Sequence, residues 1–137
     1  MELDAARDFI REHHRAVMAT RRQDGAPQMS IVAANVDDAG RVIVSTRETA
    51  VKARNLRRNP RVSFCILPDD GWSGAWIQVD GTATVLSLPE AMEPLVEYYR
   101  STAGEHPDWD DYRAAMERDR RVLVQVELER AGPDIAG

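Results

Sequence analysis

The sequence predicts a mainly β protein with short helices, arranged around a small antiparallel barrel of six strands. Six short segments have the alternating or continuous apolar pattern of strands, and turns such as Asp24-Gly25 separate several of them. Helices do not alternate regularly with these strands, which argues against a doubly wound sheet. Closing the sheet into a barrel would remove its exposed edges. The chain has 137 residues, and we expect one domain over residues 1–137.

In the first half of the chain, apolar residues recur at helical spacing from Leu3 to His14 and predict an amphipathic helix. A second helix is expected between Thr49, a candidate N-cap, and the stop signal Asn59-Pro60. The strands expected in this half cover residues 16–20, 28–36 and 42–45, and they would form an antiparallel meander.

In the second half, a strand over residues 62–67 is followed by a loop and by a long alternating strand over residues 76–85. Gly81 lies in the middle of that strand and predicts a bulge or a sharp bend. Two helices are expected next, from Pro89 to about Tyr99 and from Asp108 to Arg118, followed by a last strand over residues 122–128.

Composition limits the classes of function. The chain is 43% hydrophobic and 30% charged, and no apolar run approaches the length needed to cross a bilayer, so we expect a cytoplasmic protein without a membrane partner. Its single cysteine, Cys65, cannot form an internal disulfide, which agrees with a reducing compartment. A net charge of −5 argues against a general nucleic-acid-binding protein. The histidines lack metal-ligand spacing, and we expect no metal site.

The basic residues are seventeen arginines and one lysine, Lys52. An ammonium suits a phosphate oxygen, and the start of a helix exposes unpaired N–H groups that favour an anion. Lys52 and Asn55 are three residues apart and would share a helix face, close to Ser45 and Thr46 at the end of the preceding strand. This arrangement predicts a phosphate pocket, and the alternative is an exposed helix with a solvated charge.

The segment from Lys52 to Ser63 resembles the phosphate-binding helix and following strand of the pyridoxamine 5′-phosphate oxidase-like superfamily, whose fold is a homodimeric split β-barrel that binds FMN. Three further segments make the chain similar to the actinobacterial branch that binds the deazaflavin coenzyme F420, the flavin/deazaflavin oxidoreductase B group. These are Ala19-Thr20 with Asp24 to Gln28, then Asp69 to Ser73, and then Ala103 to His106 with Asp108 to Arg113.

The resemblance implies a cofactor site at a dimer interface. Lys52 and Asn55 would contact the phosphate, and Ser45 and Thr46 would contact phosphate or ribityl oxygens. Four residues of one strand would run beneath the deazaflavin ring, and two residues of a loop would come from the partner subunit and cover the cofactor. The strand residues are Met29, Ser30, Ile31 and Val32, and the loop residues are Gly71 and Trp72.

One position departs from the pattern implied by the resemblance. Relatives often place an arginine two residues before the lysine, where this chain has Ala50, and either Arg47 or Arg54 would have to compensate. Without that compensation the cofactor would be held more weakly.

The resemblance implies an F420-dependent oxidoreductase that transfers a hydride to or from a small conjugated acceptor, such as a quinone, a tetrapyrrole like biliverdin, or a xenobiotic. We expect no catalytic side chain, because a cofactor of this kind supplies the chemistry and the protein supplies binding and orientation. Two alternatives stay open: an FMN-binding flavoprotein of the same superfamily, and a non-catalytic carrier of F420.

Overall fold

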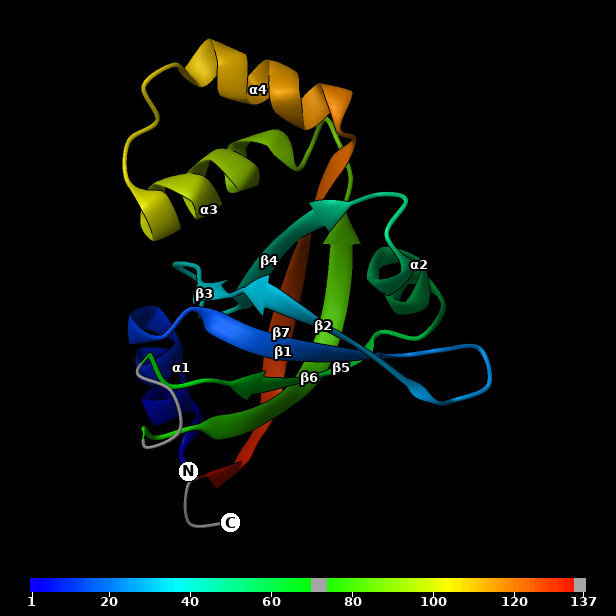
Figure 1. Cartoon of the computed structure of the whole chain (residues 1–137), viewed down its shortest axis with the longest axis vertical. Coiled ribbons are helices and arrows are strands. Elements are labelled where there is room, and N and C mark those ends of the chain that lie inside the picture. Colours follow the sequence, from blue (N-terminus) through cyan, green and yellow to red (C-terminus); the bar gives the residue numbers. More distant parts are fainter. Residues whose placement is uncertain (70–73, 135–137) are drawn as a thin grey trace.

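The computed structural model describes residues 1–69 and 74–134, and its elements follow one another as a helix, a set of strands with one helix inserted, two helices and a last long strand (Figure 1). In order they are α1 (Leu3–Glu12), β1 (Arg15–Arg21), β2 (Pro27–Ala33), β3 (Asn35–Val36), β4 (Val42–Arg47), α2 (Val51–Arg58), β5 (Arg61–Ile66), β6 (Ile77–Leu86), α3 (Met92–Ala103), α4 (Trp109–Arg118) and β7 (Arg121–Asp134).

The strands form one seven-stranded antiparallel sheet in the order β2-β1-β5-β6-β7-β4-β3. The prediction of six strands is therefore wrong, because the segment expected as one strand over residues 28–36 is divided at Ala34. Before Ala34, β2 pairs with β1, and after it, β3 pairs with β4. The Ala34 N–H still donates to the carbonyl oxygen of His14, 2.7 Å away, in the register of the β1–β2 ladder, and the chain pairs with β4 from Asn35 onward. Strands β2 and β3 follow one another in the chain, and they form the two edges of the curled sheet.

The interior of the curled sheet holds the main apolar core. Inward-facing residues alternate along β1, β5 and β6, as the sequence pattern predicts. The predicted irregularity at Gly81 is confirmed, because the pairing of β6 with β7 changes register between Asp80 and Gly81. A Cβ atom at Gly81 would lie 2.2 Å from the Glu127 carbonyl oxygen, so a side chain there would push the two strands apart.

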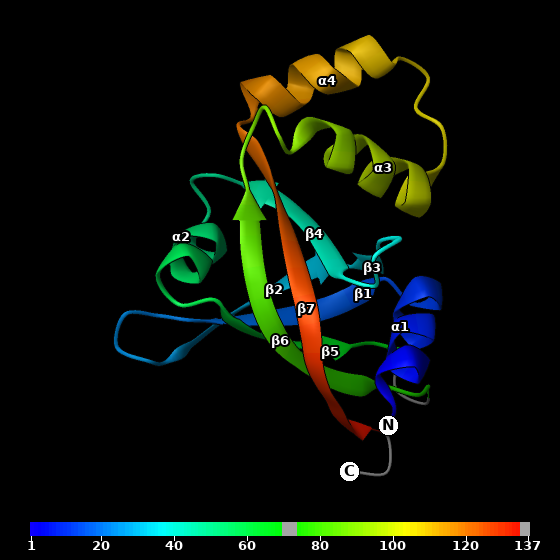
Figure 2. The same ribbon diagram turned by 180° about the vertical axis from the view of Figure 1, so that it is seen from behind.

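Helices α3 and α4 form a lobe at one end of the barrel, with α1 and α2 on opposite sides below it (Figure 2). The lobe explains why β7 is buried on both faces between Val122 and Val126. Leu123 packs with Ile43, Ala91 and Leu95 in a second apolar cluster beneath α3. Within residues 1–69 and 74–134, no helix has both the length and the apolar character required to span a bilayer.

Candidate functional site

Two strand edges near α2 lack a partner strand among the described residues. Strand β4 pairs with β7 along its whole length, but on its other side it pairs with β3 only at Val42 and Ile43. Strand β2 pairs with β1 alone. The free edge of β2 and the free edge of β4 over residues 44–47 diverge from Ala34, and we call the space between them the split. Such edges offer unpaired backbone N–H and C=O groups to a ligand.

Tyr98 of α3 reaches the edge of β2 beside Ala34, where the two borders of the split diverge. Its hydroxyl donates to the Ala33 carbonyl oxygen of β2 at 2.7 Å. The pKa of Tyr98 is raised because burial disfavours the phenolate, while a hydrogen bond with the Ser45 backbone of β4 and the charge of Arg121 oppose that rise. Tyr98 therefore connects α3 to the β2 border of the split, and sequence reasoning did not identify it.

Helix α2 lies beside the barrel and is attached to it through Asn55. The side chain of Asn55 is 5% exposed, and its Nδ2 donates to the Thr20 hydroxyl at 3.0 Å while its Oδ1 accepts from Arg58 at 2.9 Å. Thr20 in turn donates to Gln28 at 3.0 Å. Asn55 thus anchors α2 to β1 and has one amide hydrogen left for a ligand. Its predicted phosphate contact stays a prediction.

The predicted cap of α2 is wrong. The helix begins after Ala50, which has no side chain that could cap it, and Thr49 makes no capping hydrogen bond. The first N–H groups of α2 therefore have no side-chain cap, which leaves them available to an anion. The predicted stop at Asn59 is confirmed.

Lys52 lies in the first turn of α2 and is partly exposed. Its pKa is lowered, first because burial disfavours the ammonium and then because the positive charge of Arg121 is nearby. In the described part of the chain, no carboxylate forms an ion pair with Lys52, and no hydrogen bond occupies its ammonium. Lys52 is therefore a cation next to another cation, without a counter-ion.

Arg121 begins β7, opposite Arg47 of β4, and sequence reasoning missed it. Its Nε atom is buried and has no hydrogen-bond partner. The same charge acts on the pKa values of Lys52 in α2, Tyr98 in α3 and Tyr112 in α4. The only signal in the sequence is a basic residue before an apolar strand, which says little in a chain rich in arginine.

The four predicted residues of β2 divide between two faces. Ser30 lies opposite the buried Met18 and is itself partly buried, and its hydroxyl oxygen has no hydrogen-bond partner. Met29 and Ile31 point to the other face and are 62% and 72% exposed. All four residues contribute to the same backbone edge, but their side chains lie on opposite faces. A ligand in the split would therefore contact that edge and the side chains of one face only. Val32 lies on the same face as Ser30.

The remaining predicted residues also separate. Thr46 is 5% exposed and faces inward, whereas Ser45 is partly exposed and lies on the face covered by α3. Gly71 and Trp72 lie outside the described residues, so their predicted role as a lid from the partner subunit stays a prediction.

The groups around the split fit a phosphate-bearing cofactor. They include an ammonium, a buried guanidinium Nε and a buried hydroxyl, all without partners among the described residues. Hydrogen-bond donors without an opposing carboxylate are the set that a phosphate requires. A cavity of about 190 Å³ borders Arg121 and extends to Glu48 and Ser87. A larger cavity of about 720 Å³ lies elsewhere, on the outer face of β1, β5 and β6, and includes neither Lys52 nor Arg121.

The fold and sequence both match known proteins. A conserved hypothetical protein of Mycobacterium tuberculosis, Rv2991, is 27% identical, with 96% of this chain and 82% of that chain covered and a TM-score of 0.77. An F420 reductase is 20% identical over 87% of this chain and 89% of that chain, with a TM-score of 0.65. The heme storage protein HutZ of Vibrio cholerae is 18% identical over 98% of this chain and 96% of that chain, with a TM-score of 0.69.

The last two likenesses show a shared fold and nothing more specific. The sequence itself matches the pyridoxamine 5′-phosphate oxidase family over residues 3–132, which is nearly the whole chain. The chain therefore belongs to the pyridoxamine 5′-phosphate oxidase family, with the split-barrel fold of that family.

Proposed function

We propose that this protein is an F420-dependent oxidoreductase that transfers a hydride between the deazaflavin coenzyme and a small conjugated acceptor, such as a quinone, a tetrapyrrole like biliverdin, or a xenobiotic. The observation that carries the proposal is the pair of neighbouring cations, Lys52 and Arg121, which have no carboxylate partner in residues 1–69 and 74–134. Membership of a family of cofactor-binding oxidases and a shared fold with an F420 reductase support it.

In this proposal, Lys52 and Arg121 hold the cofactor phosphate, and the free N–H groups at the start of α2 add to that hold. The backbone edges of β2 and β4 offer hydrogen bonds to the polar rim of the ring, and Ser45 and Thr46 lie closest to the ribityl chain. The bound deazaflavin would supply a hydride carried on carbon. The protein orients the two reactants and excludes water from the contact between them. We assign no side chain as a general acid.

The proposal includes a homodimer. Met29 and Ile31 are large apolar side chains on the outer face of β2, and both are more than half exposed. Their strand partners on β1 are Ala19 and Val17, so the exposed strip continues as an apolar face. An exposed apolar strip of this kind is typical of an interface, and we propose that a second copy of the same chain covers it. The partner would contribute Gly71 and Trp72 to the cofactor site.

The proposal is tested by titrating the purified protein with F420, FMN and hemin, and by following fluorescence or absorbance. We expect saturable binding of F420 that is weakened in Lys52→Ala and unchanged in Arg57→Ala, because Arg57 of the same helix is already paired with Glu48 at 2.8 Å. Binding of FMN alone would support the flavoprotein alternative. Binding of hemin alone, unaffected by Lys52→Ala, would contradict both.

Catalysis needs a second measurement. Reduced F420 is bound to the protein and mixed with menadione or biliverdin, and oxidation of the cofactor is followed by its fluorescence. Oxidation faster than in free solution supports an oxidoreductase. If the bound cofactor is oxidised more slowly than the free cofactor by every acceptor, the protein is a carrier.

A further inference from the structure

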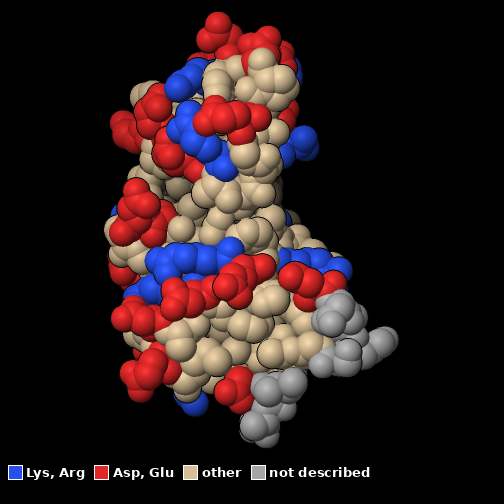
Figure 3. Space-filling model, turned by 90° about the vertical axis from the view of Figure 1, so that its left-hand side faces the viewer, with Lys and Arg blue, Asp and Glu red and all other residues tan. Residues whose placement is uncertain are grey.

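A cavity of about 490 Å³ lies between α3 and the turn that joins β3 to β4, and we call it the α3 groove. It is separate from the split, because its lining includes no residue of β2 and none of residues 44–47 of β4. On the face shown in Figure 3, acidic and basic side chains border an uncharged waist between the helical lobe and the barrel. Its volume falls in the range of small-molecule sites, roughly 300–1,000 Å³.

The floor of the α3 groove is apolar except for one amide. Ile43 and Leu123 are 3% and 1% exposed, and Gln125 lies directly opposite Ile43 in the pairing of β4 with β7. Gln125 is 9% exposed and lines the groove, yet its side chain makes no hydrogen bond with any described residue. No described residue occupies the hydrogen-bonding groups of this amide, and it lines the groove, so it is available to a ligand that lies on the apolar floor.

The walls of the α3 groove carry an excess of negative charge. Glu93, Glu97 and Ser101 follow one another at four-residue spacing on one face of α3, and Asp37 and Asp38 face them from the turn. The lining holds four carboxylates and one guanidinium, that of Arg41, which gives a formal charge of −3.

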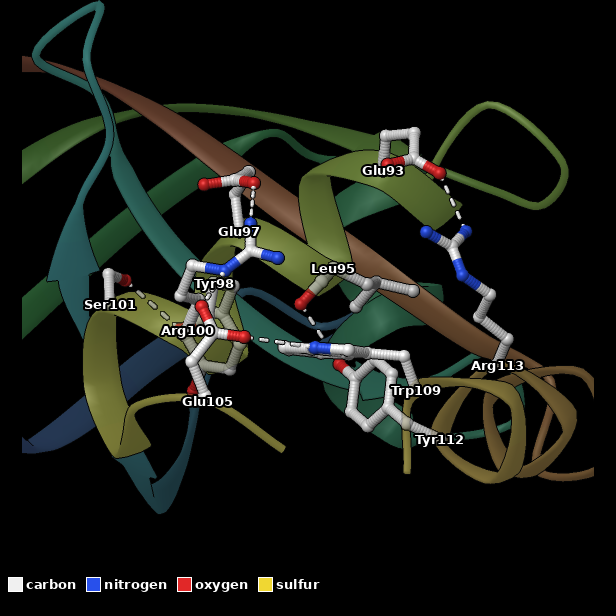
Figure 4. A network of polar contacts seen from close by, with 10 residues as sticks. All are labelled: Glu93, Leu95, Glu97, Tyr98, Arg100, Ser101, Glu105, Trp109, Tyr112 and Arg113. Carbon is white, nitrogen blue, oxygen red and sulfur yellow. Dashed lines mark hydrogen bonds and ion pairs between the residues drawn. The ribbon is translucent and has the colours of Figure 1, made fainter. Parts of the chain in front are cut away.

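Salt bridges reduce this charge without reversing it. Arg113 and Arg100 pair with Glu93 and Glu97 from outside the lining and bring the charge to −1 (Figure 4). Arg41 pairs with Asp37 at 2.9 Å. Asp38 has no ion pair with any described residue, so it is the free counter-charge of the groove.

We propose that the α3 groove binds a small organic cation. Its apolar body lies on Ile43 and Leu123, one of its N–H groups donates to the Gln125 side-chain oxygen, and its positive charge faces Asp38. The argument rests on the apolar floor, the unpartnered amide and the charge of the walls, and it does not depend on F420 binding in the split.

The test compares three probes of the same shape: benzamidinium, which is positive, benzamide, which is neutral, and benzoate, which is negative. Each is added to ¹⁵N-labelled protein, and the amide signals are followed by NMR. We expect benzamidinium to shift the side-chain signal of Gln125 and the backbone signals of the β3–β4 turn, with a dissociation constant of about 1 mM or below. Benzamide should bind several-fold more weakly, and benzoate should cause no shift.

Two variants with matched controls test the residues. Gln125→Leu should weaken benzamidinium binding about tenfold while the spectrum stays folded, because an unpartnered amide adds nothing to the core. If that variant does not fold, Gln125→Met replaces it. Gln78→Leu is the control, since Gln78 lines the cavity on another face. Asp38→Asn should weaken binding several-fold, whereas Asp24→Asn in the other hairpin turn should not.

Several outcomes would overturn the proposal. Equal shifts with all three probes would mean an apolar cavity without charge selection. Shifts that persist unchanged in Gln125→Leu would place the probe elsewhere. Binding of a lysine-rich peptide without binding of benzamidinium would identify a protein-docking surface instead. Loss of F420 binding with intact benzamidinium binding would leave this proposal standing and contradict only the function proposed above.

Discussion

Helix α2 carries two kinds of basic residue, and they differ in what surrounds them. Arg57 donates to both carboxylate oxygens of Glu48 and to the Ser87 hydroxyl, and Arg58 donates to the Arg21 carbonyl oxygen and to Asn55. Lys52, one turn earlier, has no such partner in the described chain and lies near a second cation. The number of charges therefore does not mark the candidate site. A cation without a partner among the described residues marks it.

The largest effect is expected from removing the ammonium group of Lys52. Lys52→Ala should weaken binding of F420 by about 1.5–3 kcal/mol, the scale of a hydrogen bond to a charged group. Isothermal titration measures the change, and Arg57→Ala is the matched control on the same helix. An unchanged affinity in Lys52→Ala would remove the proposed difference between the two kinds of residue.

Arg121 should behave like Lys52 and unlike the paired arginines. Arg121→Gln keeps a hydrogen-bonding side chain but removes the charge, and we expect it to weaken F420 binding by about 1.5 kcal/mol. The double variant with Lys52→Ala should lose less than the sum of the two single losses if both groups contact one phosphate. Strict additivity in this cycle would mean that the two cations bind different parts of the cofactor.

The exposed apolar side chains allow a similar comparison. Ile31 on β2 is 72% exposed and Val51 on α2 is 54% exposed, but only Ile31 lies in the strip proposed to face a second copy. Ile31→Asp should shift the protein toward monomers in sedimentation velocity, because a charge would be desolvated in the interface. Val51→Asp should not. A monomeric wild-type protein would contradict the proposed dimer.

The pH dependence of stability gives the smallest effect. The pKa of Lys52 is lowered below its usual 10.5 in the folded protein, so the unfolded chain binds more protons between the lowered pKa and 10.5. The contribution of Lys52 to the free energy of unfolding should therefore rise as the pH rises through that range. Urea unfolding of the wild type and of Lys52→Met at several pH values measures it. A rise of the same size in both proteins would show that Lys52 does not contribute.

Much of the fold was predictable because it depends on local patterns. Alternation along β6, the bulge at Gly81 and the stop of α2 at Asn59 all follow from short-range rules, and the structure confirms them. The division of residues 28–36 was not predictable, because the apolar pattern continues through Ala34 while the pairing partner changes. That change depends on how the whole sheet curls.

The site was predictable only in part, for the same reason. Lys52 stands out as the only lysine of the chain, and the resemblance to a known family identified it. Arg121 is one of seventeen arginines, and only its buried Nε distinguishes it. Tyr98 reaches the split from a helix more than sixty residues further along the chain than β2, which is a relation that no local pattern contains.

The single bend at Ala34 also sets the direction from which the split can be filled. Both of its borders leave from that point, where Tyr98 reaches β2, and the β4 border leads on into α2. If the deazaflavin binds as proposed, its ring would lie toward Ala34 and its anionic end would lie beside Lys52 at the start of α2. We therefore expect the flat end of any occupant to be inserted first and its charged end to be the last part to dock.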